Sequence, residues 1–462
     1  MTPQRQLFSS GIVVVLVFSI SISLCFGRGT SPGSTSRNRG NGSRRLPLHK
    51  GSSTRPLTPP PIRVDVFGGA KGDNRTDDTK AFERAWEKAC SSNGKVVLLV
   101  PPHKSYRVKQ ITFSGAQCKS HLTMQIHGTI MAFGELSDYH FPNNSKLHYW
   151  LTFESVQNLV VEGPGTINGN GDKWWQSSCK QNNKTHKPVP NCNNDAPTAV
   201  TFKKCNNLMV NNLNFEKAQR KHVSFENCTN VKAFGISVNA PEGSPNTDGI
   251  HVTETKNIHI SNSRISTGDD CISIISGSRN VQATNITCGP GHGISIGSLG
   301  KDGSEDHVSD VTVTGARLNG TMYGVRIKTW PGGSGYATNI TFQNIQMDNV
   351  TNPIIIDQNY CDTATKVING ECKPPPLQGR SNAVKVHNVT YRNITGTVAK
   401  GGEAIKFDCS KTVRDGCDKI VLENIKLDKG AAVVWSNVGK LTCQGLVSPN
   451  INQCRNNIKF AL

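Results

Sequence analysis

A short sequence phrase returns many times after residue 157. It begins at residues 158, 207, 230, 257, 280, 310, 339 and 388, and each copy is an Asn or Asp followed by alternating β-branched residues and a second turn. Most copies are 23 to 30 residues apart, and the two intervals of 49 residues contain insertions. Periods of 20 to 50 residues are typical of solenoids and similar repeat folds.

The length of the repeat restricts the fold further. A coil of about 25 residues without helical periodicity is too short for a pair of helices and matches a parallel β-helix. We expect inward-facing ladders of Val, Ile and Leu to form the core. The recurrent Asn suits the bends, because stacked Asn side chains can bond the backbone of neighbouring coils.

The segment before the repeats predicts a helix that covers the open end of the solenoid. It reads DNRTDDTKAFERAWEKAC and ends near Cys90, with Asp77 or Asp78 as the candidate N-cap. The competing interpretation, a calcium loop around these aspartates and Asp73, does not fit the spacing of an EF-hand. Three apolar residues share one face of the predicted helix: Phe82, Trp86 and Ala89.

The first 63 residues differ in composition from the rest. Residues 12–26 are apolar and follow Arg5, which predicts a signal peptide over residues 1–26. This apolar run is shorter than the roughly 20 residues that a membrane-spanning helix needs. Residues 27–63 are rich in Gly, Ser, Pro and Arg and predict a disordered basic propeptide or linker, which leaves residues 64–462 for the β-helix.

The charge of the chain indicates an acidic partner. The formal net charge is +19, and nine of the 52 Lys and Arg lie before residue 64, where there is no acid. Nucleic acid, anionic lipid and polyanionic sugar all satisfy a basic surface. The export signal excludes nucleic acid, so the basic tail is interpreted as a solvated linker or a tether to cell-wall polyanions.

The cysteines also fit an exported protein. Loss of the signal peptide leaves 14 of the 15, and the sequence has no C-x-x-C spacing, which favours disulfides over zinc. Cys205 and Cys228 are expected to stack on adjacent coils, either as a disulfide or as two free thiols. Local spacing suggests four pairs: Cys179 with Cys192, Cys361 with Cys372, Cys409 with Cys417, and Cys443 with Cys454.

Sequons are numerous and predict glycosylation. Two of them, at Asn285 and Asn339, lie inside strand-like segments and are expected to be buried and unmodified. The others considered as glycan sites are Asn74, Asn143, Asn183, Asn319 and Asn349.

Three consecutive coils carry ionisable residues, two Asp and one His, in one register. The motifs D-G-I-H-V, D-C-I-S-I and H-G-I-S-I begin 22 residues apart, at Asp248, Asp270 and His292. Stacked coils place these three side chains in a column, with Asp269 beside Asp270. Strict alternation would point the column inward with the isoleucines, so either the strands begin after these residues or three polar groups are buried.

The next coil adds cations to the same region. The run G-V-R-I-K-T-W places Arg326, Lys328 and Trp330 on the outer face, where Trp330 either stacks on a sugar or packs locally. Clustered carboxylates cannot all ionise cheaply, so we expect one to have a raised pKa and donate a proton while another acts as base. This combination is suited to glycoside hydrolysis.

These motifs, in this order and spacing, resemble the signature motifs of polygalacturonases, glycoside hydrolase family 28. They are NTDGIH from residue 246, GDDCISI from residue 268, GHGISIGSLG from residue 291 and RIK from residue 326. The resemblance covers residues 64–462 and implies an all-β, single-stranded, right-handed parallel β-helix (a pectin-lyase-like solenoid) as the catalytic domain. It also implies hydrolysis of α-1,4 bonds between galacturonates with inversion and without metal or cofactor.

The resemblance implies a role for each acidic site residue. Asp269 would be the general acid on the glycosidic oxygen, and Asp248 and Asp270 would activate the attacking water. His292 would tune the proton of the acid and contact the substrate. Inversion needs room for water, roughly 6.5 to 9.5 Å between the acid and base carboxyl groups, which the structure can test.

The resemblance also implies substrate-binding residues. Arg326 and Lys328 would bind a galacturonate carboxylate, a charge-assisted contact that selects an acidic sugar. Tyr360, in the DQNYCD segment, would lie near the bound sugar, and Asn246 would shape the site.

We therefore expect a secreted, monomeric endo-polygalacturonase that acts on de-esterified pectin in the plant cell wall, in wall loosening or cell separation. Pectin is the expected partner, with no nucleic acid and no membrane after signal removal. The near alternative is an exo-polygalacturonase. Two alternatives from other classes are a calcium-dependent, pectate-lyase-like enzyme with an arginine base, and a noncatalytic pectin-binding β-helix.

Overall fold

A computed structural model describes residues 60–140, 148–180, 192, 196–361, 367–368, 371–372, 382–412, 416–428 and 431–446. The predicted signal peptide and most of the predicted linker lie outside these residues. Residues 60–63 are described, and Ile62–Arg63 form strand β1, so strand structure begins before the predicted boundary at residue 64. None of the helices in the described residues is long and apolar enough to cross a membrane.

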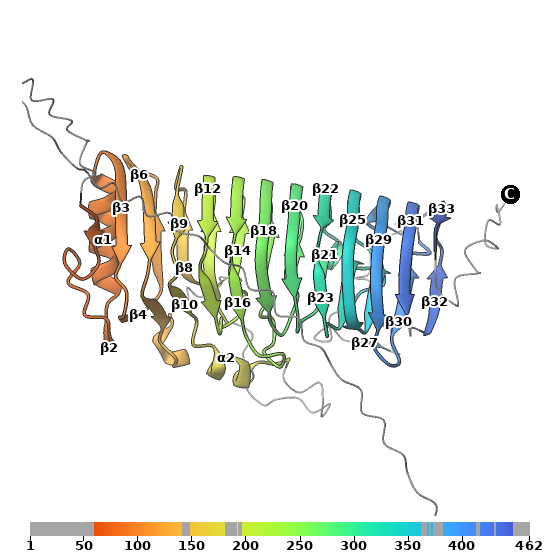
Figure 1. The fold of residues 1–462 in the computed structure, drawn as a ribbon, viewed down its shortest axis with the longest axis horizontal. Coiled ribbons are helices and arrows are strands. Elements are labelled where there is room, and N and C mark those ends of the chain that lie inside the picture. Colours follow the sequence, from red (N-terminus) through yellow and green to blue (C-terminus); the bar gives the residue numbers. More distant parts are fainter. Residues whose placement is uncertain are drawn as a thin grey trace, which may run out of the picture. The chain divides into compact units, whose positions relative to one another are not determined.

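Most strands of the described chain are parallel and lie in two sheets, and they follow one another in chain order from the end that carries α1 to β33 (Figure 1). One sheet has 11 strands, in sequential order: β5 (Ile111–Ser114), β8 (Tyr149–Glu154), β11 (Thr198–Lys203), β14 (Val223–Glu226), β17 (Ile250–Thr253), β19 (Ile272–Ile274), β21 (Ile294–Leu299), β24 (Tyr323–Thr329), β26 (Asn352–Asp357), β30 (Glu403–Asp408) and β32 (Ala431–Ser436). The predicted parallel β-helix is confirmed.

The second sheet has 20 strands among the described residues and supplies the other sides of each coil. Its strands are β1, β2 (Asp73–Asp77), β3 (Gly94–Val100), β4 (Ser105–Val108), β6 (Ser120–Ile126), β7 (Thr129–Ala132), β9 (Val160–Glu162), β10 (Thr166–Asn168), β12 (Asn206–Asn211), β13 (Asn214–Glu216), β15 (Thr229–Phe234), β16 (Ser237–Asn239), β18 (Lys256–Ser266), β20 (Arg279–Cys288), β22 (Glu305–Thr314), β23 (Arg317–Asn319), β25 (Ser334–Val350), β29 (Lys385–Val398), β31 (Cys417–Asp428) and β33 (Leu441–Gln444). Among the described residues, the short elements outside both sheets are α2 (Asp172–Ser177), two single 3-10 turns (Leu136–Asp138 and Lys301–Gly303) and the antiparallel pair β27 (Val367–Ile368) and β28 (Glu371–Cys372).

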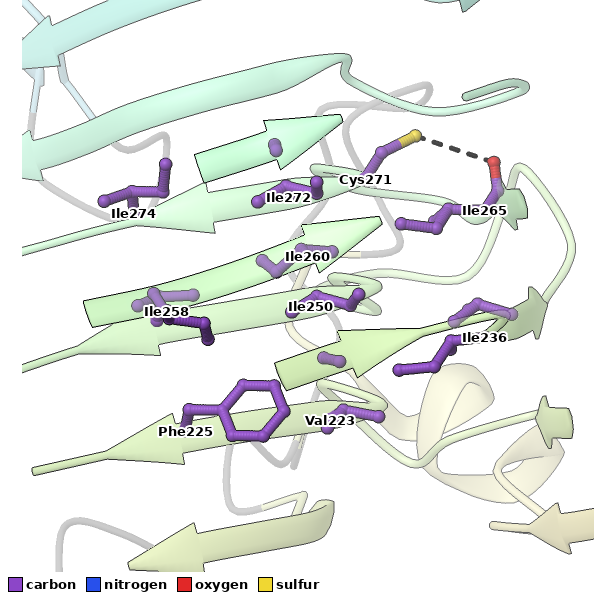
Figure 2. Packing of buried hydrophobic residues seen from close by; sticks show 14 of the residues in the cluster. Val223, Phe225, Ile236, Ile250, Ile258, Ile260, Ile265, Cys271, Ile272 and Ile274 are labelled. Atoms are coloured by element: carbon purple, nitrogen blue, oxygen red, sulfur yellow. Dashed lines mark hydrogen bonds between the residues drawn. The ribbon is translucent and has the colours of Figure 1, made fainter. Parts of the chain in front are cut away.

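Apolar side chains stack in register between the sheets, as the sequence pattern predicts. In the 11-stranded sheet Ile250, Ile272 and Ile294 are paired on successive coils, and all are fully buried. Figure 2 shows Ile258 and Ile260 of β18 packing from the other sheet toward Ile250 and its neighbours. Side chains along a strand point alternately to its two sides. The residues that follow Ile250, Ile272 and Ile294 in sequence therefore face outward, and this outer face carries the site.

The recurrent asparagines form ladders at the bends. Asn207, Asn230, Asn257 and Asn280 all have positive φ, between 54° and 58°, and each amide donates to an Asn side chain one coil earlier at 3.0 to 3.2 Å. The predicted role at the bend is confirmed, but these bonds run from side chain to side chain rather than to the backbone. Asn suits this position because its short polar side chain tolerates the left-handed conformation.

The predicted N-terminal helix is confirmed as α1 (Thr79–Ser91), with Phe82, Trp86 and Ala89 buried. It packs against β1, β3, β5 and β6 at the first coils (Figure 1). The N-cap residue is Asp78, the second of the two candidates, but its carboxylate accepts the Lys71 and Gly72 backbone N–H groups instead of capping the helix. The carboxylate of Asp77 accepts the Thr79 backbone N–H at 3.0 Å.

The cysteines resolve in part as predicted. The disulfides Cys179–Cys192 and Cys409–Cys417 are present, and Cys205 and Cys228 are buried free thiols, the second of the two alternatives. The pairs Cys361–Cys372 and Cys443–Cys454 each include a side chain outside the described residues. In the described part of the chain, two further disulfides were not predicted: Cys90–Cys118 and Cys271–Cys288.

The sequons at Asn285 and Asn339 are exposed, so the prediction that they are buried is wrong. Both face outward at bends, where the Asn285 amide donates to Asn262 at 2.7 Å and the Asn339 amide donates to Asp310 at 3.0 Å. Asn143 and Asn183 lie outside the described residues. Asn74, Asn319 and Asn349 are exposed.

Candidate active site

The predicted column of acidic residues is present on the outer face of the 11-stranded sheet. Asp248, Asp270 and His292 each lie two residues before a strand, and those strands pair in register. The strands therefore begin after these residues, one of the two predicted arrangements, although Asp248 and Asp270 are also buried. Gly293 follows His292 with a φ of 75°, a conformation that glycine adopts without strain.

Asp270 is the most enclosed carboxylate of the cluster, with 3% of its side chain exposed. Ser295 Oγ donates to one carboxylate oxygen at 2.7 Å, Arg326 Nη2 donates to the same oxygen at 2.8 Å, and Lys328 Nζ donates to the other at 2.8 Å. Burial opposes the charge of Asp270, but Lys328 and Arg326 outweigh burial and lower its pKa. The predicted cationic shelf beside the acidic column is confirmed.

Asp269, which precedes Asp270 in sequence, is more exposed, with 18% of its side chain accessible. Its Oδ1 lies 3.0 Å from His292 Nδ1 and accepts the Asp270 backbone N–H at 2.9 Å. Burial and the charge of Asp248 oppose its ionisation, but His292 and Lys328 outweigh them, so the pKa of Asp269 is also lowered.

The third carboxylate, Asp248, accepts Ser273 Oγ–H at 2.6 Å and lies 3.7 Å from His251 Nδ1. Burial opposes its charge, but His251 and Lys221 lower its pKa to about 2. The expectation of one carboxylate with a raised pKa is thus wrong for the substrate-free protein. The reason is that each carboxylate in the cluster has a cation or imidazole as close neighbour, which favours the ionised form.

The cluster also has the spacing of a possible cation site. One oxygen each from Asp269 and Asp270 and one ring nitrogen of His292 lie within 4.8 Å of one another. Arg326 and Lys328 already donate to both oxygens of Asp270, so two fixed positive charges occupy the place that a metal would neutralise. The donor set therefore fits a metal poorly.

Aromatic rings border the cations. The Arg326 guanidinium lies 3.8 Å from the centroid of the Tyr323 ring, and Lys328 Nζ lies 5.3 Å from that of Tyr360. Tyr360, a predicted substrate-binding residue, therefore lies next to the cationic shelf. Trp330 is buried edge-on against Tyr360 at 5.6 Å between ring centroids, which favours the packing alternative for Trp330.

Asn246 lies at the edge of the site rather than in the carboxylate cluster. It is half-buried, two residues before Asp248, and lines a small cavity with Gln219 and Arg220. A larger groove of about 560 Å³ lies elsewhere, on the 20-stranded sheet beside the Asn ladder, and none of its lining residues belongs to the carboxylate cluster.

Sequence reasoning missed several residues around the carboxylates. Ser273, Ser295 and His251 contact Asp248 or Asp270 directly, whereas Lys221 contacts His251 and Tyr323 lies against Arg326. Three of them lie within the aligned motifs, as the H of D-G-I-H-V and the S of D-C-I-S-I and of H-G-I-S-I. Their outward parity was the available signal. Lys221 precedes β14 by two residues, as Asp248 precedes β17, but no motif marks it.

Comparison with solved structures gives the class of fold. The chain resembles the polygalacturonase of Erwinia carotovora with a TM-score of 0.63 at 22% identity, over 79% of this chain and 94% of that one. The fold is therefore a parallel β-helix of the pectin-lyase-like kind.

Sequence comparison gives the family. Residues 90–444 match the model of glycosyl hydrolases family 28. The chain is 59% identical to a polygalacturonase of Malus domestica over 388 residues, covering 84% of this chain and 78% of that protein. It is 55% identical to polygalacturonase-2 of Solanum lycopersicum over 366 residues, covering 79% and 74%. The chain belongs to glycosyl hydrolase family 28 and is a glycoside hydrolase, which confirms the predicted resemblance.

Proposed function

We propose that this enzyme is an endo-polygalacturonase that hydrolyses α-1,4-galacturonosyl bonds of de-esterified pectin with inversion. The observation that carries the proposal is a cluster of three carboxylates, Asp248, Asp269 and Asp270, on one outer face with two buried cations. Arg326 and Lys328 both donate to Asp270. The plant relatives in the same family are named polygalacturonases, which supports the choice of substrate.

The cations supply recognition of an acidic sugar. Arg326 and Lys328 each spend one donor on Asp270, and the guanidinium and ammonium groups have further N–H donors. A galacturonate carboxylate can take these donors in a charge-assisted contact that a neutral sugar cannot make. Tyr360 borders the same sugar, and Asn246 shapes the site from its edge.

Asp269 is the proposed general acid. Its pKa is lowered in the free enzyme by His292 and Lys328, so it needs a change of environment to hold a proton. The substrate supplies that change, because a bound galacturonate adds negative charge and offsets the Lys328 and Arg326 charges, which raises the pKa of a neighbouring carboxyl. His292, at 3.0 Å, orients the acid toward the glycosidic oxygen.

Asp248 and Asp270 are proposed to activate the water. One oxygen of Asp269 and one of Asp270 lie within 4.8 Å of each other. The separation of roughly 6.5 to 9.5 Å between acid and base carboxyl groups that inversion needs stays a prediction. Both oxygens of Asp270 already accept from Arg326 and Lys328, whereas Asp248 accepts from the neutral Ser273 hydroxyl. This difference favours Asp248 as the proton acceptor, with Asp270 holding the cations in place. Inversion itself remains our proposal, and NMR observation of the first anomer released tests it.

Endo action is favoured by polar residues that continue along the same register on both sides of the carboxylates. Lys221 precedes them, and Tyr323 and Asn352 follow them; these three residues are half-buried. A chain lying along the solenoid axis therefore meets polar groups in both directions. An exo-acting enzyme is the alternative, in which one direction is closed.

The setting of the activity is also a proposal. We infer a signal peptide at residues 1–26, export of a monomer to the plant cell wall, and pectin degradation in wall loosening or cell separation. The apolar run after Arg5, the net positive charge and the plant relatives support this setting.

The decisive assay follows reducing ends, viscosity and ultraviolet absorbance together on de-esterified polygalacturonate with calcium chelated. Release of reducing ends with a rapid fall in viscosity and no absorbance supports an endo-hydrolase. A slow fall in viscosity with monomer release indicates exo action. Absorbance that grows only with calcium indicates a lyase, and binding without any product indicates a noncatalytic protein; either result overturns the proposal.

A further inference from the structure

A chain of three polar side chains leads from outside the carboxylate cluster to Asp248. Lys221 Nζ lies 2.8 Å from His251 Nε2, His251 Nδ1 lies 2.7 Å from Ser273 Oγ, and Ser273 Oγ lies 2.6 Å from Asp248 Oδ2. The members come from three successive coils, since His251 and Ser273 are paired between β17 and β19, and Lys221 precedes β14. His251 and Ser273 are buried, whereas Lys221 is half-buried.

The chemistry of these groups fixes the direction of each hydrogen bond. An ionised Asp248 only accepts, so Ser273 spends its one proton on it. Ser273 Oγ must then accept from His251 Nδ1–H, which leaves His251 Nε2 as a lone-pair acceptor for the Lys221 ammonium. All donors therefore point from Lys221 toward Asp248, and His251 is neutral with its proton on Nδ1.

The neighbouring coil has a similar serine-to-aspartate hydrogen bond, but the donor beyond the serine is a different kind of group. Ser295, which pairs with Ser273, donates to Asp270 at 2.7 Å and accepts from Arg326 Nε at 3.1 Å. The Asp270 chain thus ends on a permanently charged guanidinium, and Lys328 fixes its other oxygen. The Asp248 chain instead ends on an imidazole and an amine, both of which exchange protons in an ordinary pH range.

We propose that Lys221, His251 and Ser273 form a positioning chain that orients Asp248 and sets its basicity as the acceptor of a proton from the hydrolytic water. This inference rests on the proposed function, because it refines which carboxylate accepts the proton. None of the three residues needs to touch the sugar, so each acts through Asp248. The hydrogen-bonded chain from Arg326 through Ser295 to Asp270 instead holds the two cations in place.

The charged groups around Lys221, His251 and Ser273 keep this hydrogen-bonded chain intact in mildly acidic conditions. Arg220, Glu226, Asp248 and Asp269 are the charged groups that act on Lys221, and burial, the largest effect, lowers its pKa to about 8. Glu226 is itself held by Tyr149 at 2.9 Å and Ser224 at 2.9 Å.

His251 experiences Lys221, Asp248 and Glu226, and burial followed by Lys221 lowers its pKa below the usual value. In a protonated His251 both ring nitrogens carry a proton, so the Nε2–H donor would face the donor ammonium of Lys221 and their hydrogen bond would be lost. The hydrogen-bonded chain is therefore intact only while His251 is neutral. Lys221 is therefore both a donor to His251 and the charge that keeps it neutral.

The test compares two substitutions at one position. In His251→Gln the amide offers one donor and one acceptor and can bridge Ser273 and Lys221, whereas His251→Leu breaks the chain. We expect kcat on polygalacturonate to fall at least about tenfold in His251→Leu with little change in KM, and to recover most of that loss in His251→Gln. His259→Leu is the matched control, since this exposed imidazole contacts Thr284 on the other sheet and leaves kcat unchanged.

Equal kcat in wild type and His251→Leu would overturn the proposal. Equal loss in the Leu and Gln variants would do so as well, since it would indicate a packing role alone. Thermal unfolding of each variant confirms that the comparison is made on folded protein.

A second measurement is independent of catalysis. NMR of the His251 ring should show the neutral Nδ1–H tautomer, and Lys221→Met should raise the pKa of His251 because it removes a like charge. The same variant should move the acid limb of kcat/KM to higher pH, since the pKa values of His251 and Asp248 both rise. An Nε2–H tautomer overturns the chain even in an active enzyme. A correct tautomer in a protein without hydrolase activity would instead overturn the proposed function.

Discussion

Removing the Lys328 charge tests the ion-pair centre of the site. Lys328 Nζ donates to Asp270 at 2.8 Å, and only 9% and 3% of the two side chains are exposed. At an effective dielectric constant of about 20, two unit charges at this separation attract by roughly 6 kcal/mol. Much of that gain is offset by the desolvation of Lys328, and breaking a buried pair typically costs about 3–5 kcal/mol. Because Arg326 still neutralises Asp270, we expect Lys328→Met to lower the free energy of unfolding by about 2–3 kcal/mol.

The loss of stability in Lys328→Met should be larger at neutral pH than at acidic pH. The pKa of Asp270 is lowered in the folded protein, so this carboxylate stabilises the fold above its unfolded pKa of about 3.9, and that contribution is lost as the pH falls through the folded pKa. Lys328→Met raises the pKa of Asp270. The loss of stability should therefore be full near neutral pH and shrink below about pH 4.

Thermal unfolding from pH 3 to pH 7 measures this effect. For a domain of about 390 residues, 1 kcal/mol corresponds to roughly 1 °C, so we expect a fall of about 3 °C at pH 7. Lys406→Met is the matched control: it breaks an exposed pair with Glu403 (3.1 Å) on the same sheet and should cost less than about 1 kcal/mol. An unchanged midpoint for Lys328→Met, or a shift that is as large at pH 3 as at pH 7, would refute the reasoning.

Two further predictions concern the core. Phe202 is fully buried between Phe153 and Phe225, with ring centroids 5.0 and 5.4 Å away, so Phe202→Ala should cost about 3–5 kcal/mol and lower the unfolding midpoint by about 4–6 °C in calorimetry; a shift below 1 °C would contradict the stacked core. Cys205 and Cys228 are buried free thiols, so they should react with a thiol reagent only after unfolding, and mass mapping that finds them linked in the native protein would disprove this assignment.

The register of the site could be predicted from the sequence because a parallel stack converts equal spacing into a column. Steps of 22 residues between Asp248, Asp270 and His292 are sufficient once the coils are known to be parallel. The outward parity of Arg326 and Lys328 followed from the same alternation. Helix α1 was predictable because its apolar face and its start are both local signals.

The electrostatics of the site could not be predicted in this way. The direction of each pKa shift depends on contacts such as Lys328 with Asp270, between residues 58 positions apart, and the strand period does not give which side chains meet. Lys221 was missed because its coil carries no motif, and Cys271–Cys288 because it joins two different sides of the solenoid rather than close neighbours in sequence. Such cross-coil contacts are set by packing.

The central claim is that the carboxylate cluster performs hydrolysis with Asp269 as the acid. The most direct test is kcat on de-esterified polygalacturonate for wild type and Asp269→Asn, with Asp310→Asn, in β22 of the 20-stranded sheet, as the control. Loss of a general acid should lower kcat by about 10²-fold or more in Asp269→Asn, while the control stays close to wild type. A folded Asp269→Asn variant with wild-type kcat would contradict the account.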